Sequence, residues 1–282
     1  MNKILLNLSV LLKTRTQKPA GYFQVVFLLH TLATTINKIN IRTATVLRNY
    51  IYKNFNRELI IRNDIGVFCV NAKDDSFIKS IPTYEVDYQP WLSKPKERNI
   101  MIDIGSNIGF FSILALNKYG YQSVYAFEPH PQAFSRLEKN VYLNKLEKNM
   151  HVFNVPLSST QSVMDFKAGS VHTGGSSLEK DRKEEECELL SLQTNTFDKI
   201  SKQREIKVKN IDFIKIDVEG HENEVLIGME HTLREVKTGT HLFIELNSDA
   251  AETEQTKKFL KKYNFAQENL ANSISNYLFV KN

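Results

Sequence analysis

The chain has 282 residues, enough for one large α/β domain with an appendage. Apolar residues make up 41% of it and charged residues 24%, which excludes an extensively disordered chain. Cys69 and Cys187 are the two cysteines, which excludes a disulfide framework and favours a reducing, intracellular setting. The net charge of +5 is uneven: residues 1–57 hold nine Lys and Arg and no Asp or Glu, whereas the rest holds 28 basic and 32 acidic residues.

Residues 1–57 are predicted to form a basic helical extension. The apolar stretches 4–12 and 22–36 are too short or too interrupted for a membrane span, which needs roughly 20 mainly apolar residues. We expect them to be helices that cap the core or lie at a membrane surface. A basic arm also suits an anionic polymer or a nucleic acid, and nucleic acid is the less expected partner. The expected location is the cytoplasm, with peripheral membrane association as an option.

Residues 58–98 are predicted to form a collar that precedes the main domain. The strand-like segments 58–62 and 65–70 flank Asn63 and Asp64, a pair typical of a turn, and therefore predict a β-hairpin. A helix is expected over residues 74–92.

Strand-like and helix-like segments alternate in the predicted main domain, residues 99–282, which indicates βαβ units around a parallel sheet. The expected strands cover residues 99–104, 123–127, 150–157, 211–217, 241–246 and 276–280, and the expected helices cover 109–118, 131–145, 221–236 and 251–263. Two further strands, 163–167 and 187–192, flank an irregular loop and predict an antiparallel insertion. The last strand is expected to run antiparallel and to complete the sheet.

The first chemical motif is the turn after the strand 99–104. Residues 100–111 read I-M-I-D-I-G-S-N-I-G-F-F, so the strand ends near Asp103, turns at Gly105 and leads into a helix at Gly109. A doubly wound sheet places its cofactor at this edge. The glycine spacing matches neither the dinucleotide pattern G-x-G-x-x-G nor a phosphate loop. An acidic residue here suits the ammonium group of S-adenosylmethionine, directly or through water.

Two more acidic turns follow at expected strand ends. Glu128, followed by Pro129, lies about 20 residues after the glycine turn and is placed to accept hydrogen bonds from ribose hydroxyls. The turn after residues 211–217 holds four ionisable side chains, a clustering typical of active sites. These are Asp217, Glu219, His221 and Glu222. His221 is either a general base or a helix cap, and Glu222 is expected only to favour the helix dipole.

With L-I-G-M at residues 226–229 and L-F-I-E at 242–245, these motifs resemble the FkbM-type family of S-adenosylmethionine-dependent methyltransferases over residues 99–246. The resemblance implies a Rossmann-like, seven-stranded class I methyltransferase sheet with helices on both faces. It also implies an O-methyltransferase that acts on a hydroxyl of a carbohydrate or polyol-like acceptor. Cofactor contacts are implied for Asp103, Gly105, Asn107 and Gly109, a ribose contact for Glu128, and a reaction-site role for Asp217 and Glu245. Ser106 and Pro129 adjoin these residues in the same two turns and are also expected to contact the cofactor.

Other segments are candidates to complete the site. Leu157 and Ser158, at the end of the strand 150–157, either flank the adenine or simply pack the strand. Tyr84 and Glu85 in the collar are candidates to reach over the methionine end of the cofactor. The loop 172–177 is a substrate lid or a surface turn, and the charged run 179–188 is expected to be a solvated face.

Methyl transfer from a sulfonium is an in-line displacement, so the site must align the acceptor and exclude water. A sugar hydroxyl is a weak nucleophile, and we expect His221 or Asp217 as its base, with Glu245 holding a substrate hydroxyl. A divalent cation on Asp217 and Glu245 is an alternative that we do not favour, because two carboxylates supply few of the oxygen ligands that such a cation needs. The competing interpretations are an RNA methyltransferase that docks through the basic arm and a non-catalytic cofactor-binding module.

Overall fold

A computed structural model describes residues 15–16, 28–29, 43, 50, 58–71, 74–169, 187–246, 250–268 and 275–282. Most of the basic extension, the loop 172–177 and nearly all of the charged run 179–188 lie outside these residues, so the predictions made for them stay predictions. Of the extension, β1 (Arg15–Thr16) pairs antiparallel with β2 (Glu58–Arg62) of the collar.

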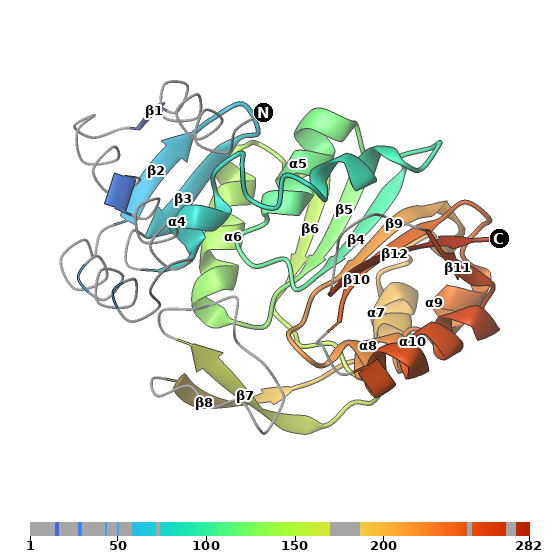
Figure 1. The fold of residues 1–282 in the computed structure, drawn as a ribbon. Coiled ribbons are helices and arrows are strands. Elements are labelled where there is room, and N and C mark those ends of the chain that lie inside the picture. The colour runs from blue at the N-terminus through green and yellow to red at the C-terminus, as the bar shows by residue number, and fades with distance from the viewer. Residues whose placement is uncertain are drawn as a thin grey trace.

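Seven strands form the central sheet in the order β11-β12-β10-β9-β4-β5-β6 (Figure 1). Their bounds are β4 (Ile100–Ile104), β5 (Ser123–Phe127), β6 (Met150–Phe153), β9 (Ile211–Ile216), β10 (His241–Glu245), β11 (Phe265–Gln267) and β12 (Asn276–Lys281). The five strands from β10 to β6 pair in parallel, whereas β12 runs antiparallel to both of its neighbours. This arrangement confirms the predicted Rossmann-like methyltransferase sheet, including its antiparallel closing strand.

Helices cover both faces of the sheet, because side chains alternate between the two faces along each buried strand. Met101 belongs to the core under α5 (Phe110–Tyr119) and α6 (Pro131–Leu143), whereas Ile102 belongs to the core on the opposite face. The opposite face is covered by α7 (Phe197–Gln203), α8 (Glu222–Ile227), α9 (Glu230–Glu235) and α10 (Ala250–Lys262). Figure 1 shows these two helical layers with the sheet between them.

The collar packs on α6 and shares its core. As predicted, β2 and β3 (Val67–Asn71) form an antiparallel hairpin. The side chains of Asn140 and Asn144 accept hydrogen bonds from the β3 backbone at 2.6 and 2.8 Å. Arg136 of α6 forms a buried ion pair with Asp74 at 2.7 Å. These contacts fix the collar against the edge of the sheet domain.

Two predicted helices are divided in the structure. The single helix over residues 74–92 is wrong: α4 (Ser76–Lys79) and the 3-10 helix η1 (Gln89–Ser93) are separated by turns. Pro82 accounts for the break, because proline lacks an N–H donor and disfavours helix at the preceding residue. The helix over 221–236 divides into α8 and α9 at Gly228, which packs against the Ser158 carbonyl. The short elements α7 and β11 were not predicted.

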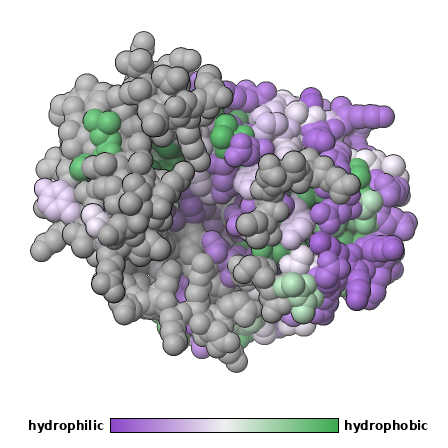
Figure 2. Space-filling model, in the orientation of Figure 1, coloured by the Kyte–Doolittle hydropathy of each residue, from purple (hydrophilic) through white to green (hydrophobic). Residues whose placement is uncertain are grey.

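The predicted antiparallel insertion is confirmed as a hairpin of β7 (Val163–Gly169) and β8 (Cys187–Gln193). It forms a separate two-stranded sheet with its own small core around Phe166 and Ala168. In Figure 2, hydrophilic residues dominate the described surface on the side of α10, with hydrophobic residues in scattered spots. Across the described ranges, every helix is too short or too polar to cross a membrane.

Candidate active site

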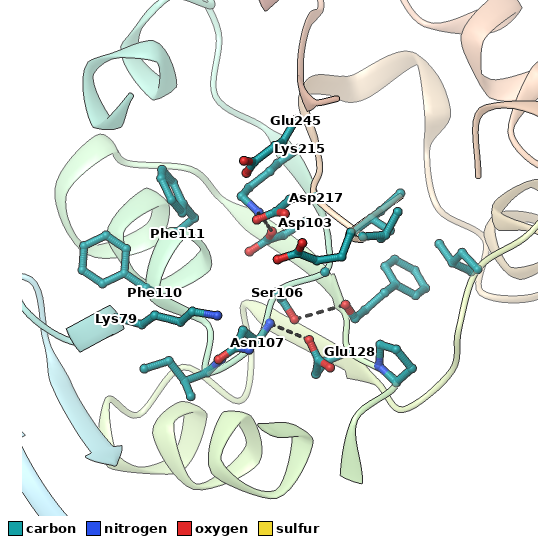
Figure 3. Close-up of a pocket in the computed structure, with 18 of the residues that line it drawn as sticks. Lys79, Asp103, Ser106, Asn107, Phe110, Phe111, Glu128, Lys215, Asp217 and Glu245 are labelled. Carbon is teal, nitrogen blue, oxygen red and sulfur yellow. Dashed lines mark hydrogen bonds and ion pairs between the residues drawn. The ribbon is translucent and has the colours of Figure 1, made fainter. Parts of the chain in front are cut away.

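A cavity of about 390 Å³ opens at the carboxyl edge of the parallel strands (Figure 3). Parallel strands end at one edge, so the turns after β4, β5 and β9 and the last residue of β10, Glu245, all contribute to its wall. The collar closes one side, and Phe166 of the β7 and β8 hairpin closes another. Ten of the twelve residues predicted for the site line this cavity, namely Asp103, Gly105, Ser106, Asn107, Glu128, Pro129, Leu157, Asp217, His221 and Glu245. The other two, Gly109 and Ser158, lie behind the wall.

The glycine turn after β4 has the close approach that its sequence predicts. Gly105 has φ +79°, and a Cβ atom there would lie 1.7 Å from the backbone oxygen of Asp217. The amides of Gly105 and Ser106 both donate to the Phe127 carbonyl at 3.0 Å, which ties this turn to the end of β5. Gly109 is the N-cap of α5 and has φ +82°, a left-handed conformation that favours glycine, and a Cβ there would lie 2.5 Å from Leu137 Cδ1.

Glu128 links the turns that follow β4 and β5. Its Oε2 accepts a hydrogen bond from the Asn107 amide at 2.7 Å, and its Oε1 accepts one from the His130 amide at 2.8 Å. Burial raises the pKa of this carboxyl to about 7. A carboxylate has about four acceptor sites, so two remain for further donors. The ribose contact expected of Glu128 stays a prediction.

Asp103 and Lys215 lie side by side at the floor of the cavity, in register across β4 and β9. The Oδ2 atom of Asp103 accepts a hydrogen bond from Ser112 at 2.5 Å, whereas its Oδ1 accepts none from the described residues. Lys215 Nζ lies 3.9 Å from this Oδ1 and 3.0 Å from Asp217 Oδ2. Burial raises the pKa of Asp103. Asp103 is thus a buried carboxylate with one oxygen that has no hydrogen-bond donor among the described residues.

Sequence analysis assigned no role to Lys215, although the sequence does indicate that this lysine is unusual. A lysine stands in the otherwise apolar strand F-I-K-I, two residues before Asp217 and therefore on the same face. Lys79 of α4 also lines the cavity, in an ion pair with Asp75 at 3.2 Å. No local signal pointed to these collar residues, because only the tertiary packing brings α4 to the sheet edge.

The end of the cavity near β9 and β10 is polar and acidic. Asp217 and Glu245 face it from adjacent strand ends, and Tyr84 and Glu85 face it from the collar. Burial, followed by the charges of Asp217 and Glu85, raises the pKa of Glu245 to about 8. Glu85 has φ 43°, a conformation that residues other than glycine adopt at a cost. Tyr84 and Glu85 are therefore cavity residues, and their predicted reach over the methionine end of the cofactor stays a prediction.

His221 and Glu222 have different partners. His221 Nε2 lies 3.0 Å from Ser158 Oγ, and the side chain makes no capping hydrogen bond to α8. Glu222 accepts hydrogen bonds from the amides of Val218 and Gly220, at 3.0 to 3.3 Å, and so stabilises the turn that carries Glu219. Burial raises the pKa of Glu222 to about 7. His221 is thus a cavity residue held by Ser158, and Glu222 has a local structural contact.

The end of the cavity near β6 is apolar. Val155, Pro156 and Leu157 follow β6, and Phe166 reaches the cavity from the hairpin. Phe166 is 2% exposed and packs edge-on against His130 at 6.2 Å between ring centroids. The sequence did not assign Phe166 to the site, because nothing local indicates that an inserted hairpin folds back to the sheet edge.

The acidic end of the cavity bears on the alternative of a divalent cation on Asp217 and Glu245. Within the parts of the chain that the structure describes, no group of three or more His, Cys, Asp or Glu side chains is arranged to hold a metal ion.

A Rossmann-like sheet of this strand order, with an acidic glycine turn and a second carboxylate at the next strand tip, defines a nucleoside-binding fold of the methyltransferase type. The methyltransferase FkbM domain matches residues 103–266, more than half of the chain. The chain therefore belongs to the FkbM family, whose members are S-adenosylmethionine-dependent methyltransferases.

Individual proteins that resemble this chain have low sequence identity to it. Hexuronic acid methyltransferase AglP of Haloferax volcanii is 28% identical over 166 residues, which cover 59% of this chain and 63% of AglP. Methyltransferase sdnD of Sordaria araneosa is 28% identical over 203 residues, with 61% of this chain and 76% of sdnD covered. Among solved structures, M. jannaschii TYW2 in complex with AdoMet has a TM-score of 0.41 at 15% identity, covering 80% of this chain and 84% of TYW2.

Proposed function

We propose that the protein transfers a methyl group from S-adenosylmethionine to a hydroxyl of a carbohydrate or polyol-like acceptor. The observation that carries the proposal is the polar end of the cavity, where Asp217 and Glu245 lie beside the glycine turn and face the collar. Carboxylates are the usual partners of sugar hydroxyls, since they accept hydrogen bonds from them. The name of the relative AglP, a hexuronic acid methyltransferase, supports a carbohydrate acceptor.

The two ends of the cavity give the cofactor one direction. Glu128 would hold the ribose, and Leu157 and Phe166 at the apolar end would flank the adenine. Gly105, Asp103 and Asp217 would hold the methionine part. The acceptor would enter at the polar end.

When bound, S-adenosylmethionine supplies an electrophilic methyl group on a sulfonium. Glu245 is the best proton acceptor for the incoming hydroxyl, because its pKa of about 8 is close to the pH at which enzymes work. Its side chain also makes no hydrogen bond to the described residues, whereas His221 is held by Ser158. Asp217, fixed by Lys215, orients the acceptor beside the methyl group.

Calorimetric titration with S-adenosylmethionine, followed by transfer of a radiolabelled methyl group into glycan, lipid and RNA fractions of the host, tests this proposal. We expect binding, and label in the glycan fraction or in a glycolipid that releases it on deglycosylation. Label only in RNA would contradict the acceptor class, and binding without transfer to any fraction would favour a non-catalytic module.

Variants then separate Glu245 from His221 as the base. Glu245→Gln should preserve cofactor binding and slow transfer by about 100-fold or more, the range of general base catalysis. His221→Gln keeps a polar partner for Ser158 and should slow transfer less. The reverse order would assign the base to His221, which the sequence predicts as one of two bases, the other being Asp217.

A further inference from the structure

Lys215 carries more hydrogen-bonding capacity than the described residues use. Its side chain is 4% exposed, and its Nζ makes one hydrogen bond, to Asp217 Oδ2 at 3.0 Å. An ammonium group has three N–H donors. The Phe111 ring, 5.5 Å away, faces the same Nζ but accepts only weakly. Buried donors are almost always paired, so the remaining N–H groups point to a ligand in the cavity that Lys215 lines.

The unused donors stand next to an unused acceptor. Asp103 Oδ1 accepts no hydrogen bond from the described residues and lies 3.9 Å from Lys215 Nζ. A buried cation and a buried anion with free capacity, side by side, complement a molecule that carries both charges on adjacent groups. An α-amino acid zwitterion has this character, with its ammonium and its carboxylate on one carbon.

We infer that Lys215 binds the carboxylate of the methionyl part of the cofactor while Asp103 takes its ammonium group. The inference rests on the proposed use of S-adenosylmethionine and adds the residue that recognises its acid group.

A carboxylate at this end of the cavity needs a cation, because Asp103, Asp217, Glu85 and Glu245 all lie there and would repel it. Although burial opposes it, the charges of Asp217 and Asp103 raise the pKa of Lys215, so the lysine stays protonated. Lys79, the other lysine of the described wall, lies on the side of Asn107 and Glu128 and pairs with Asp75 (Figure 3). Lys215 is thus the cation at the methionine end.

Three ligands that share the same nucleoside but differ in their charged groups test the contact between Lys215 and the carboxylate. S-adenosylhomocysteine carries both charged groups, its decarboxylated analogue keeps only the amine, and 5′-methylthioadenosine has neither. By calorimetry, the wild-type protein should bind S-adenosylhomocysteine roughly 10- to 100-fold more tightly than the decarboxylated analogue, the range of a charge-assisted hydrogen bond. Equal affinity for these two ligands would overturn the inference without any variant.

The variant Lys215→Met should remove this preference by weakening S-adenosylhomocysteine alone. Its affinity for 5′-methylthioadenosine should stay within about threefold of the wild-type value, because nucleoside contacts are unchanged. Lys237→Met is the matched control. Lys237 pairs with the buried Asp212 at 2.7 Å outside the cavity wall, so its loss should leave the ligand preference intact.

Other outcomes have distinct meanings. If Lys215→Met weakens all three ligands equally, the lysine only shapes the pocket, and the inference is wrong. It is also wrong if Lys79→Met rather than Lys215→Met removes the preference, or if Lys215→Met slows transfer without changing ligand affinity. If the wild-type protein binds none of the three ligands, the proposed function itself fails.

Discussion

Gly105 and Asp217 approach each other so closely that a single added carbon atom would collide with the backbone. A Cβ on Gly105 would lie 1.7 Å from the Asp217 oxygen and 2.8 Å from its carbonyl carbon. The neighbour is backbone at the end of a central strand, which cannot swing aside as a flexible side chain can. This contact therefore fixes the distance between the cofactor turn and the strand tip that carries Asp217.

The substitution Gly105→Ala should accordingly cost about 3 kcal/mol or more of unfolding free energy and abolish binding of S-adenosylhomocysteine, because the turn must move. Gly120→Ala is the control. Gly120 also has a left-handed φ, +75°, but a Cβ there meets nothing within 4 Å. Its cost should be about 1 to 2 kcal/mol with unchanged binding. Urea unfolding and calorimetry measure both, and equal effects of the two substitutions would contradict the collision argument.

Phe166 provides a test for the adenine end of the cavity. Phe166→Leu keeps an apolar side chain but removes the ring, and should weaken S-adenosylhomocysteine and 5′-methylthioadenosine alike, by about 3- to 10-fold, the range of an aromatic contact. Val163→Ala changes the same strand at a side chain that is 71% exposed, and should leave both affinities unchanged. An unchanged affinity in Phe166→Leu would place the adenine elsewhere.

Much of the site was predictable because the strand ends of a parallel sheet converge. Asp103, Glu128, Asp217 and Glu245 each lie at or directly after the end of a recognisable buried strand, and the sheet brings all four to one cavity as expected. Their roles in binding and catalysis stay predictions, since only the placement is observed.

The parts that the sequence did not reveal depend on contacts between distant segments. Lys79 reaches the site because the collar packs on α6, and Phe166 does so because the hairpin folds back over the strand ends. Neither residue stands in a local pattern that indicates this. Lys215 is different, since a lysine on the buried face of a central strand is itself a signal of a charged partner.

The collar should unfold together with the sheet domain, because its hydrophobic residues belong to the core under α5 and α6. Arg136→Ala tests this through the buried pair with Asp74, whose side chains are 9% and 3% exposed. Removing one partner of a buried pair should cost about 3 to 5 kcal/mol, with a single urea transition. Lys139→Ala, from the half-exposed pair with Glu58, should cost about 1 kcal/mol or less. Two separate transitions would show that the collar is an independent unit.

The ionisation of Glu245 should lower the stability of the protein and raise its activity as the pH increases. Its folded pKa of about 8 lies above the ordinary value near 4.5, because burial and the charges of Asp217 and Glu85 disfavour the ionised form. The stability that protonated Glu245 contributes is therefore complete below about pH 4.5 and is lost as the pH rises through about 8. Transfer needs the carboxylate, so activity should rise over the same upper range.

Glu245→Gln is neutral at every pH and separates these effects. At pH 9 the variant should melt at a temperature higher than the wild type by roughly 2 to 4 °C, the shift that about 1 kcal/mol produces in a domain of this size. At pH 5 the two melting temperatures should agree, because the wild-type carboxyl is then protonated. Its residual activity should show no rise near pH 8. Melting curves without the cofactor and initial rates from pH 6 to 9.5 provide both measurements.

A variant that is less stable than the wild type at pH 9 would mean that the ionised carboxylate has a stabilising partner in the folded protein, and Glu245 could not then be the base that the pH profile requires.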